Sequence, residues 1–181
     1  MKKTFLFLIC IITASTLLAC QKPDEAASSP QKPAVSQKKE EKTINEKVEF
    51  FFPDDAVMYL CPETIQVKAK ESEFFKSVVD AVIKGPSSDE LLPSISGDVS
   101  VLSASLKDGV CIIDLSEEFS TFNTGGSTKE TMAVYSLVNT LCSIDGVEKV
   151  KININGEENP DFGGHFDLSE PLEPDHSLLK K

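Results

Sequence analysis

The chain has 181 residues, of which 18 are basic and 29 are acidic, and its formal net charge is −11. Every basic residue is a lysine, because the sequence contains no arginine. Proteins that bind nucleic acid need a basic surface and favour arginine for contacting phosphate and guanine. We therefore expect no nucleic-acid partner.

Residues 1–19 have the features of a secretory signal peptide. Lys2 and Lys3 precede the apolar run Phe5–Ile12, which is shorter than the roughly 20 residues of a membrane span. The segment ends in Leu17-Leu18-Ala19-Cys20, which resembles the bacterial lipobox, where the cysteine is acylated and becomes the mature N-terminus. We predict lipidation of Cys20 with palmitate-type acyl chains and an extracytoplasmic protein anchored in the cell membrane by this lipid. The alternative is an ordinary signal peptide followed by a chance cysteine.

Residues 20–47 are predicted to form the lipidated cysteine and a disordered tether. The segment has no aromatic residue, and its large aliphatic residues are Val35 and Ile44. Such a composition buries too little apolar surface to offset the entropy of ordering. A flexible chain of this length has a root-mean-square span of about 30 Å, which would hold a domain clear of the bilayer.

The first half of the folded region is predicted to contain strands and one helix. Alternating apolar residues predict a strand over 48–52 and another over 57–61, which residues 65–67 continue after Pro62. A helix follows, with Ser72 as its cap and Gly85-Pro86 as its end. Its apolar side consists of Phe74, Phe75, Val78, Val79 and Val82.

The second half is predicted to contain a hairpin, a helix and a final strand. Asp108-Gly109 predicts a two-residue turn between strands at 99–106 and 110–115. The second helix begins at a capping box formed by Ser127 and Glu130 and ends before Gly146. Its apolar stripe is Val134, Leu137, Val138 and Leu141.

The final strand has the clearest alternation in the chain. Val150, Ile152 and Ile154 face one way, and Lys149, Lys151 and Asn153 face the other. This pattern predicts a sheet with one covered and one wetted face. We therefore predict an α+β domain over residues 48–172, with a small mixed sheet and two helices on one face, followed by a loose polar tail over 173–181.

Several segments of this domain resemble the GerM-type (GerMN) domain, a sporulation and spore germination module of bacterial lipoproteins. The resemblance extends over Val48–Leu172 in one copy, with a departure at Ser94-Ile95-Ser96-Gly97, where a proline is expected before the glycine. Its landmarks are Val48-Glu49-Phe50-Phe51-Phe52-Pro53-Asp54, Lys84-Gly85-Pro86, Asp108-Gly109-Val110, Asp114-Leu115-Ser116-Glu117-Glu118-Phe119, Leu137-Val138-Asn139-Thr140-Leu141, Asn155-Gly156 and Gly163-Gly164-His165-Phe166-Asp167-Leu168-Ser169-Glu170-Pro171-Leu172.

The resemblance implies a non-enzymatic fold similar to the ring-building modules of secretion-type assemblies. In those assemblies a small α/β domain packs edge to edge with copies of itself or with relatives. It implies no catalytic residue and no cofactor. It also implies an envelope protein as partner or association with further copies of this chain.

Candidate chemical sites are weak when they are judged from the residues alone. Asp161-Phe162-Gly163-Gly164-His165-Phe166-Asp167 is the best metal candidate, but a structural turn is the simpler interpretation, and we predict no metal site. Gly125–Lys129 lacks the phosphate-loop order, and Ser29–Lys32 lies in the predicted tether. The adjacent carboxylates Glu117 and Glu118 are expected to point apart at a solvated edge.

Three cysteines remain in the folded region: Cys61, Cys111 and Cys142. Cys111 lies in an apolar strand and Cys142 on an apolar helix stripe, which favours buried free thiols, although secretion permits disulfides. Phe51 points away from Phe50 and Phe52, so it packs under a loop or marks a partner surface.

The predicted function is that of a membrane-anchored scaffold or assembly component of the cell envelope, linked to sporulation or spore germination and without catalytic activity. The alternative is a lipoprotein that binds a solute or a cell-wall fragment, which would require an apolar pocket with a few convergent polar groups.

Overall fold

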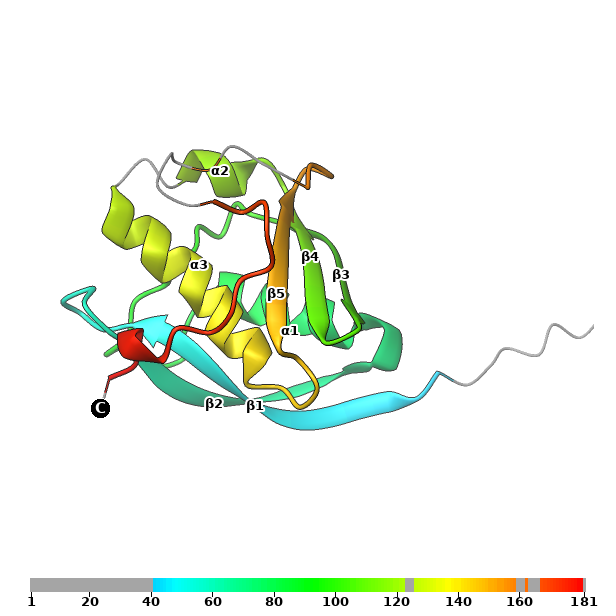
Figure 1. Cartoon of the computed structure of the whole chain (residues 1–181). Coiled ribbons are helices and arrows are strands. Elements are labelled where there is room, and N and C mark those ends of the chain that lie inside the picture. Colours follow the sequence, from blue (N-terminus) through cyan, green and yellow to red (C-terminus); the bar gives the residue numbers. More distant parts are fainter. Residues whose placement is uncertain (1–40, 123–125, 159–161, 163–166, 181) are drawn as a thin grey trace, which may run out of the picture. The chain divides into compact units, whose positions relative to one another are not determined.

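The computed structural model describes residues 41–122, 126–158, 162 and 167–180 (Figure 1). No helix in this described part of the chain is long and apolar enough to cross a membrane. The elements in chain order are β1 (Thr43–Pro53), β2 (Leu60–Lys70), the 3₁₀ turn η1 (Glu71–Glu73), α1 (Phe74–Lys84), β3 (Val101–Lys107), β4 (Val110–Leu115), α2 (Glu118–Phe122), α3 (Ser127–Cys142), β5 (Lys149–Ile154) and the 3₁₀ turn η2 (His176–Leu178).

The central sheet has three strands in the order β3-β4-β5. Strand β4 pairs antiparallel with β3 and parallel with β5. The turn between β3 and β4 is the predicted two-residue hairpin, since Asp108 and Gly109 both have positive φ angles, of 50° and 80°. The alternation predicted for β5 is also confirmed, because Val150, Ile152 and Ile154 are buried.

Two helices cover the buried face of this sheet, as predicted. Helix α1 packs on β3, α3 packs on β5, and the two helices contact each other (Figure 1). The α+β class with a mixed sheet is therefore confirmed. The core between these layers includes Cys111, Ile113 and Leu115 of β4, all fully buried.

Strands β1 and β2 form a second, two-stranded sheet instead of joining the first one. They pair antiparallel over their whole length, and they pack against α3 and α1. Phe50 and Phe52 of β1 are completely buried, as expected. The sequence pattern shows which side of a strand is apolar, but it does not show which strand becomes its neighbour, so a single sheet was the wrong expectation.

The two strands of this ribbon have different bounds from those predicted. Strand β1 begins at Thr43, so residues 43–47 belong to the domain and not to the tether predicted over 20–47. Strand β2 begins at Leu60, which leaves Val57 in the preceding turn, with a φ of 55°. Pro62 lacks a backbone N–H but still fits inside β2, because its partner Phe51 makes no hydrogen bond from its N–H to β2. The Phe51 N–H bonds instead to the Thr140 hydroxyl on α3.

Phe51 packs inside the molecule on the opposite side of β1 from Phe50 and Phe52. It is 5% exposed and forms a small cluster with Leu60 and Met132. Of the two interpretations left open by the sequence, the structure supports internal packing.

Both predicted helix caps were wrong. Ser72 lies in η1, and its hydroxyl donates to Glu41 at 2.5 Å, while the residue before α1 makes no capping hydrogen bond. Ser127 is the first residue of α3 and not its cap. Helix α1 does end at Gly85, whose φ of 87° lets its N–H reach Val82 O at 3.1 Å.

The tail predicted as loose over 173–181 is packed against the domain as far as Lys180. The Asn139 side chain on α3 donates to Asp175 O at 3.1 Å and accepts from Asp175 N at 2.9 Å. Lys180 N donates to Leu60 O at 3.0 Å, which covers the start of β2. The polar composition of the tail could not predict these contacts, because they are made by its backbone and not by its side chains.

The outer edge of β5 is closed by the chain that follows it. Val150 and Leu172 exchange two backbone hydrogen bonds of 2.9 and 2.8 Å. The Lys151 ammonium donates to Leu168 O at 2.5 Å and to Ser169 O at 2.8 Å, and it also bonds to Glu158 O. We call Leu168–Leu172 the closing segment. It covers part of the face of β5 that the alternation had predicted to be wetted.

Candidate functional site

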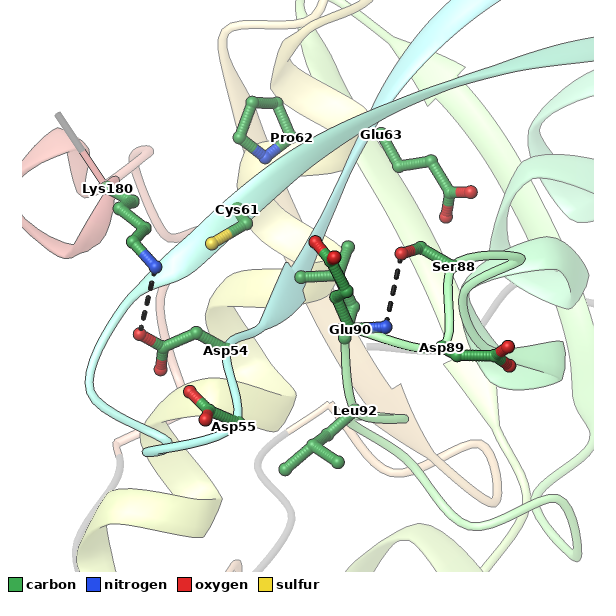
Figure 2. Close-up of a pocket in the computed structure, with 11 residues that line it drawn as sticks. Asp54, Asp55, Cys61, Pro62, Glu63, Ser88, Asp89, Glu90, Leu92 and Lys180 are labelled. Atoms are coloured by element: carbon green, nitrogen blue, oxygen red, sulfur yellow. Dashed lines mark hydrogen bonds and ion pairs between the residues drawn. The ribbon is translucent and has the colours of Figure 1, made fainter.

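A groove of about 620 Å³ lies beside the start of β2. Its walls come from the turn after β1, the first residues of β2, the loop after α1 and the C-terminal tail (Figure 2). Five carboxylates and one ammonium group line it, together with Cys61, Pro62, Ser88, Leu91 and Leu92. The charged residues are Asp54, Asp55, Glu63, Asp89, Glu90 and Lys180. We call this feature the acidic groove.

Asp54 organises one end of the acidic groove. Its Oδ1 accepts hydrogen bonds from Met58 N at 2.9 Å and from Tyr59 N at 3.2 Å, which fixes the turn between β1 and β2. Lys180 Nζ lies 3.7 Å from Asp54 Oδ2, and the two side chains face each other in Figure 2. The Met58 N–H, together with the Tyr59 N–H and the Lys180 ammonium, holds the pKa of Asp54 below its ordinary value.

Glu63 and the loop after α1 form the opposite wall. The Glu63 carboxylate accepts from Ser87 N at 3.0 and 3.2 Å, and Ser88 Oγ accepts from Glu90 N at 3.2 Å. An isolated bridge between Asp54 and Leu91 connects this loop to the end of β1. These bonds hold the groove walls in place while the carboxylates of Asp55, Asp89 and Glu90 stay available to a ligand.

The chemistry of the groove suits the binding of a cationic or hydrogen-bond-donating group. Burial raises the pKa of the Cys61 thiol, so the thiol is protonated and a poor nucleophile at neutral pH. Asp54 is already engaged by two backbone N–H groups. Among the described residues, no group of three or more His, Cys, Asp or Glu side chains is placed to hold a metal ion.

Of the residues singled out from the sequence, Cys61 lines this groove, whereas the described residues of the candidate metal, phosphate-loop and acid–base sites do not. Cys20, His165, Asp161 and Gly125 lie outside the described residues. Asp167 is exposed, and its carboxylate accepts from Ser169 N at 2.9 Å. Phe162, the one described residue between Asp161 and Asp167, is buried and stacks on Phe119 with a ring-centroid distance of 4.9 Å.

Glu117 and Glu118 were expected at a solvated edge in a strand or loop. Both are exposed, but Glu118 is the first residue of the short helix α2. A hydrogen bond from the Ser116 hydroxyl lowers the pKa of Glu118, so the carboxylate is ionised at neutral pH.

The three cysteines of the domain are free thiols in this structure. Burial raises the pKa of Cys111 to about 12 and that of Cys142 to about 11. Both thiols are therefore protonated and behave as small apolar side chains.

The acidic groove was not predicted from the sequence. Its signal was the pair of adjacent acids at Asp54-Asp55 and the second pair at Asp89-Glu90. These pairs are far apart in the sequence and meet only because Leu92 N bonds to Pro53 O and the loop lies along β1. Lys180 was assigned to a loose tail and so was not considered.

A family model described as "Germane: Sporulation and spore germination" matches residues 49–160. The chain is 30% identical over 105 residues to the spore germination protein GerM of Bacillus subtilis (strain 168). This match covers 55% of the chain but only 28% of that relative, so the chain spans little more than a quarter of its length.

Solved structures show the same fold. A candidate lipoprotein from Clostridium perfringens is 26% identical, with a TM-score of 0.52, and the match covers 72% of this chain and 87% of that one. The first GerMN domain of the Bacillus subtilis sporulation protein GerM is 21% identical, with a TM-score of 0.57, over 73% of this chain and 98% of that domain. The tandem GerMN domains of the same protein match with 22% identity and a TM-score of 0.57, over 74% of this chain and 45% of the tandem structure.

Proposed function

Because the chain belongs to the Germane family of sporulation and spore germination domains, we propose that it is a lipid-anchored, extracytoplasmic assembly component of the cell envelope. The lipid on Cys20 fixes the protein to the membrane, and the segment after it sets how far the domain can extend from the bilayer. The folded domain recruits a partner. The observation that carries this proposal is a Germane domain in the same chain as the lipobox-like Leu17-Leu18-Ala19-Cys20.

Two further observations support the anchoring. The run from Phe5 to Ile12 is too short to span a bilayer, so a signal peptide accounts for it better than a membrane helix does. A protein with the same fold and 26% identity, from Clostridium perfringens, is itself a candidate lipoprotein.

The chemistry of the described surface supports assembly over catalysis. The groove offers a protonated thiol at Cys61 and a carboxylate at Asp54 that two backbone N–H groups already engage. Neither is arranged as a nucleophile with its base. Exposed apolar side chains, which are typical of contact surfaces, lie at Met58 and Tyr59, at Leu92 in the groove wall, and along β3.

The anchoring is tested with the Cys20→Ser variant of the full chain produced in its host. We expect the unmodified protein in the membrane fraction, with an intact mass showing acyl chains on residue 20, and the variant without this mass addition and unprocessed or released. The matched control is Cys61→Ser, which removes a cysteine of the domain and leaves the location unchanged. Unmodified Cys20 in the native protein would contradict the proposal.

The assembly role is tested by affinity capture of the anchored protein from native membranes after mild cross-linking. We expect one or a few envelope proteins, or further copies of this chain, in stable stoichiometry. Recovery of the protein alone at every cross-linker concentration would contradict an assembly role.

The acidic groove favours one second candidate, a receptor for a cell-wall fragment that carries amines. Its volume of about 620 Å³ and its surplus of carboxylates would suit such a ligand. The test is titration of the protein with an amine-bearing wall peptide, comparing the native chain with Glu90→Gln and with a distant Glu46→Gln control. Weaker binding of Glu90→Gln alone supports the receptor, and no binding by the native chain excludes it.

A further inference from the structure

Strand β3 has an open edge. It is the terminal strand of the β3-β4-β5 sheet, and its other side pairs with no strand in the described part of the chain. The two-residue turn makes Lys107 and Val110 the hydrogen-bonded pair that closes the hairpin. Backbone groups alternate in direction, so the N–H and C=O of Ala104 and Leu106 point outward, away from β4. No described group bonds to them.

The other strand edges in the molecule are at least partly covered. Leu172 pairs with Val150 on the edge of β5. Thr140 Oγ1 accepts from Phe51 N, and Ser143 Oγ donates to Glu49 O at 3.0 Å, on the edge of β1. Lys180 N bonds to Leu60 O on β2. At β3 the Lys76 ammonium bonds to Val101 O at the first residue, which leaves the outward groups of Ala104 and Leu106 open. Open edges are templates for pairing with another chain.

The side chains along this edge are apolar and almost uncharged. Leu102 is 49% exposed and Leu106 is 38% exposed. The strand carries no acidic residue, and its one charge is Lys107 at the end. In a chain with a net charge of −11, two copies repel each other, and a strand without carboxylates of its own lowers that repulsion where they meet. The nearest charged pair that contacts the strand is Lys76–Asp80 of α1, whose lysine bonds to Val101 O at the start of β3.

The sequence of the edge reads the same in both directions: Leu102-Ser103-Ala104-Ser105-Leu106. A two-fold axis through Ala104 in an antiparallel pair would place Ala104 opposite Ala104 of a second copy. The same register would place each Leu102 opposite the other copy's Leu106 and each Ser103 opposite the other copy's Ser105. Such self-complementarity is the requirement for an isologous interface between identical chains.

We propose that the β3 edge pairs antiparallel with the β3 edge of a second copy, centred on Ala104. The outward backbone groups of Ala104 and Leu106 hydrogen-bond across the axis, the exposed leucines cover each other, and the two three-stranded sheets become one sheet of six strands. The proposal rests on the proposed function, because the shared membrane anchor supplies the local concentration that a short interface needs.

The interface is expected to be weak in free solution. The register between β3 and β4 shifts between Val101 and Ser103, and such a bulge limits the length of regular edge. The dimer therefore forms when copies are crowded on a membrane and dissociates when they are diluted.

The proposal is tested by a disulfide across the axis in the full chain in native membranes. Residues opposite each other in a hydrogen-bonded antiparallel pair have Cα atoms about 5.5 Å apart, which is within the range that a disulfide spans. We expect the Ala104→Cys variant to form a dimer on mild oxidation, with a 104–104 peptide identified by mass. The matched control is Thr64→Cys, exposed on β2, which should form about tenfold less dimer if the two edges differ as proposed.

A second variant tests the contact without an added cysteine. Leu106→Lys places two charges in the interface, and we expect about tenfold less chemically cross-linked dimer than for the native chain, with unchanged thermal unfolding of the monomer. Thr64→Lys adds the same charge to another strand and should leave the dimer unchanged.

Two results would overturn the proposal. One is that Ala104→Cys cross-links no more than Thr64→Cys in membranes that retain the protein. The other is that the Ala104→Cys variant cross-links to a different protein. In that case the partner at the β3 edge is not a second copy, and the proposed assembly role is unaffected. Loss of the protein from the membrane is a separate outcome, read from the membrane fraction, and it bears on the anchoring alone.

Discussion

The two outer edges of the central sheet differ in how far other parts of the chain bond to their backbone groups. The edge of β5 is closed by Leu172, which pairs with Val150, and by Lys151, which holds the carbonyls of Leu168 and Ser169. At the edge of β3 the Lys76 ammonium of α1 bonds to Val101 O at the start of the strand, but no described group bonds to Ala104 or Leu106 on the outer side. This edge also carries two exposed leucines. The closed edge contributes to the stability of the monomer, whereas the open edge contributes little to it and is available to another chain.

The largest expected effect is at the closed edge. Leu168→Ala removes a side chain that is 2% exposed and belongs to the main core, so we expect a loss of about 2–5 kcal/mol in the free energy of unfolding. The matched change at the open edge, Leu106→Ala, should cost less than about 1 kcal/mol, because that side chain is 38% exposed. Urea unfolding of both variants measures the difference. Equal losses in the free energy of unfolding would contradict the claim that the closed edge contributes more to stability than the open edge.

The next effect is at the edge of β1, where side chains provide the cover. Thr140→Val keeps the shape of the side chain but leaves the buried Phe51 N–H without its acceptor, at a cost of about 1–3 kcal/mol. Ser143→Ala, which removes the more exposed bond to Glu49 O, should cost less. A neutral effect of Thr140→Val would show that this edge needs no cover.

A smaller effect is expected where a charged side chain holds the closing segment. Lys151→Met removes the donor to the carbonyls of Leu168 and Ser169, and partial exposure limits the loss to about 1 kcal/mol. Hydrogen exchange at Leu172 N should accelerate in this variant. Lys149→Met breaks only the exposed pair with Glu173 at 2.8 Å and serves as the control, with exchange at Leu172 N unchanged.

The smallest effect is pH-dependent and concerns the tail that covers β2. The pKa of Asp54 is lowered on folding, so its carboxylate stabilises the native state above the ordinary pKa of 3.8, and this contribution is lost as the pH falls through the folded value. Asp54→Asn should therefore lower the Tm near neutral pH and converge with the native chain in acid. Parallel Tm curves at all pH values would contradict this assignment.

Sequence reasoning succeeded where the determining contacts are local. The alternation of Val150, Ile152 and Ile154 identified β5 and its buried face, and Asp108-Gly109 identified the hairpin. Each depends on residues within one element or one turn, whose conformational preferences act without help from the rest of the fold.

It failed where the determining contacts join segments that are distant in the sequence. Ser72 was expected to cap α1, but it lies inside η1, one residue too early, and its hydroxyl donates to Glu41. The tail looked loose because its backbone contacts with Asn139 and Leu60 are not encoded in its own composition. The acidic groove likewise depends on the loop after α1 lying along β1, which no local pattern predicts.

The difference between the two edges can be measured directly by residue-resolved hydrogen exchange on the membrane-anchored protein at increasing surface density. We predict that Val150 N and Leu172 N are protected at every density, while Ala104 N and Leu106 N exchange rapidly in dilute membranes and become protected as copies crowd together. Rapid exchange of Ala104 N and Leu106 N at all densities would contradict an edge that closes on assembly.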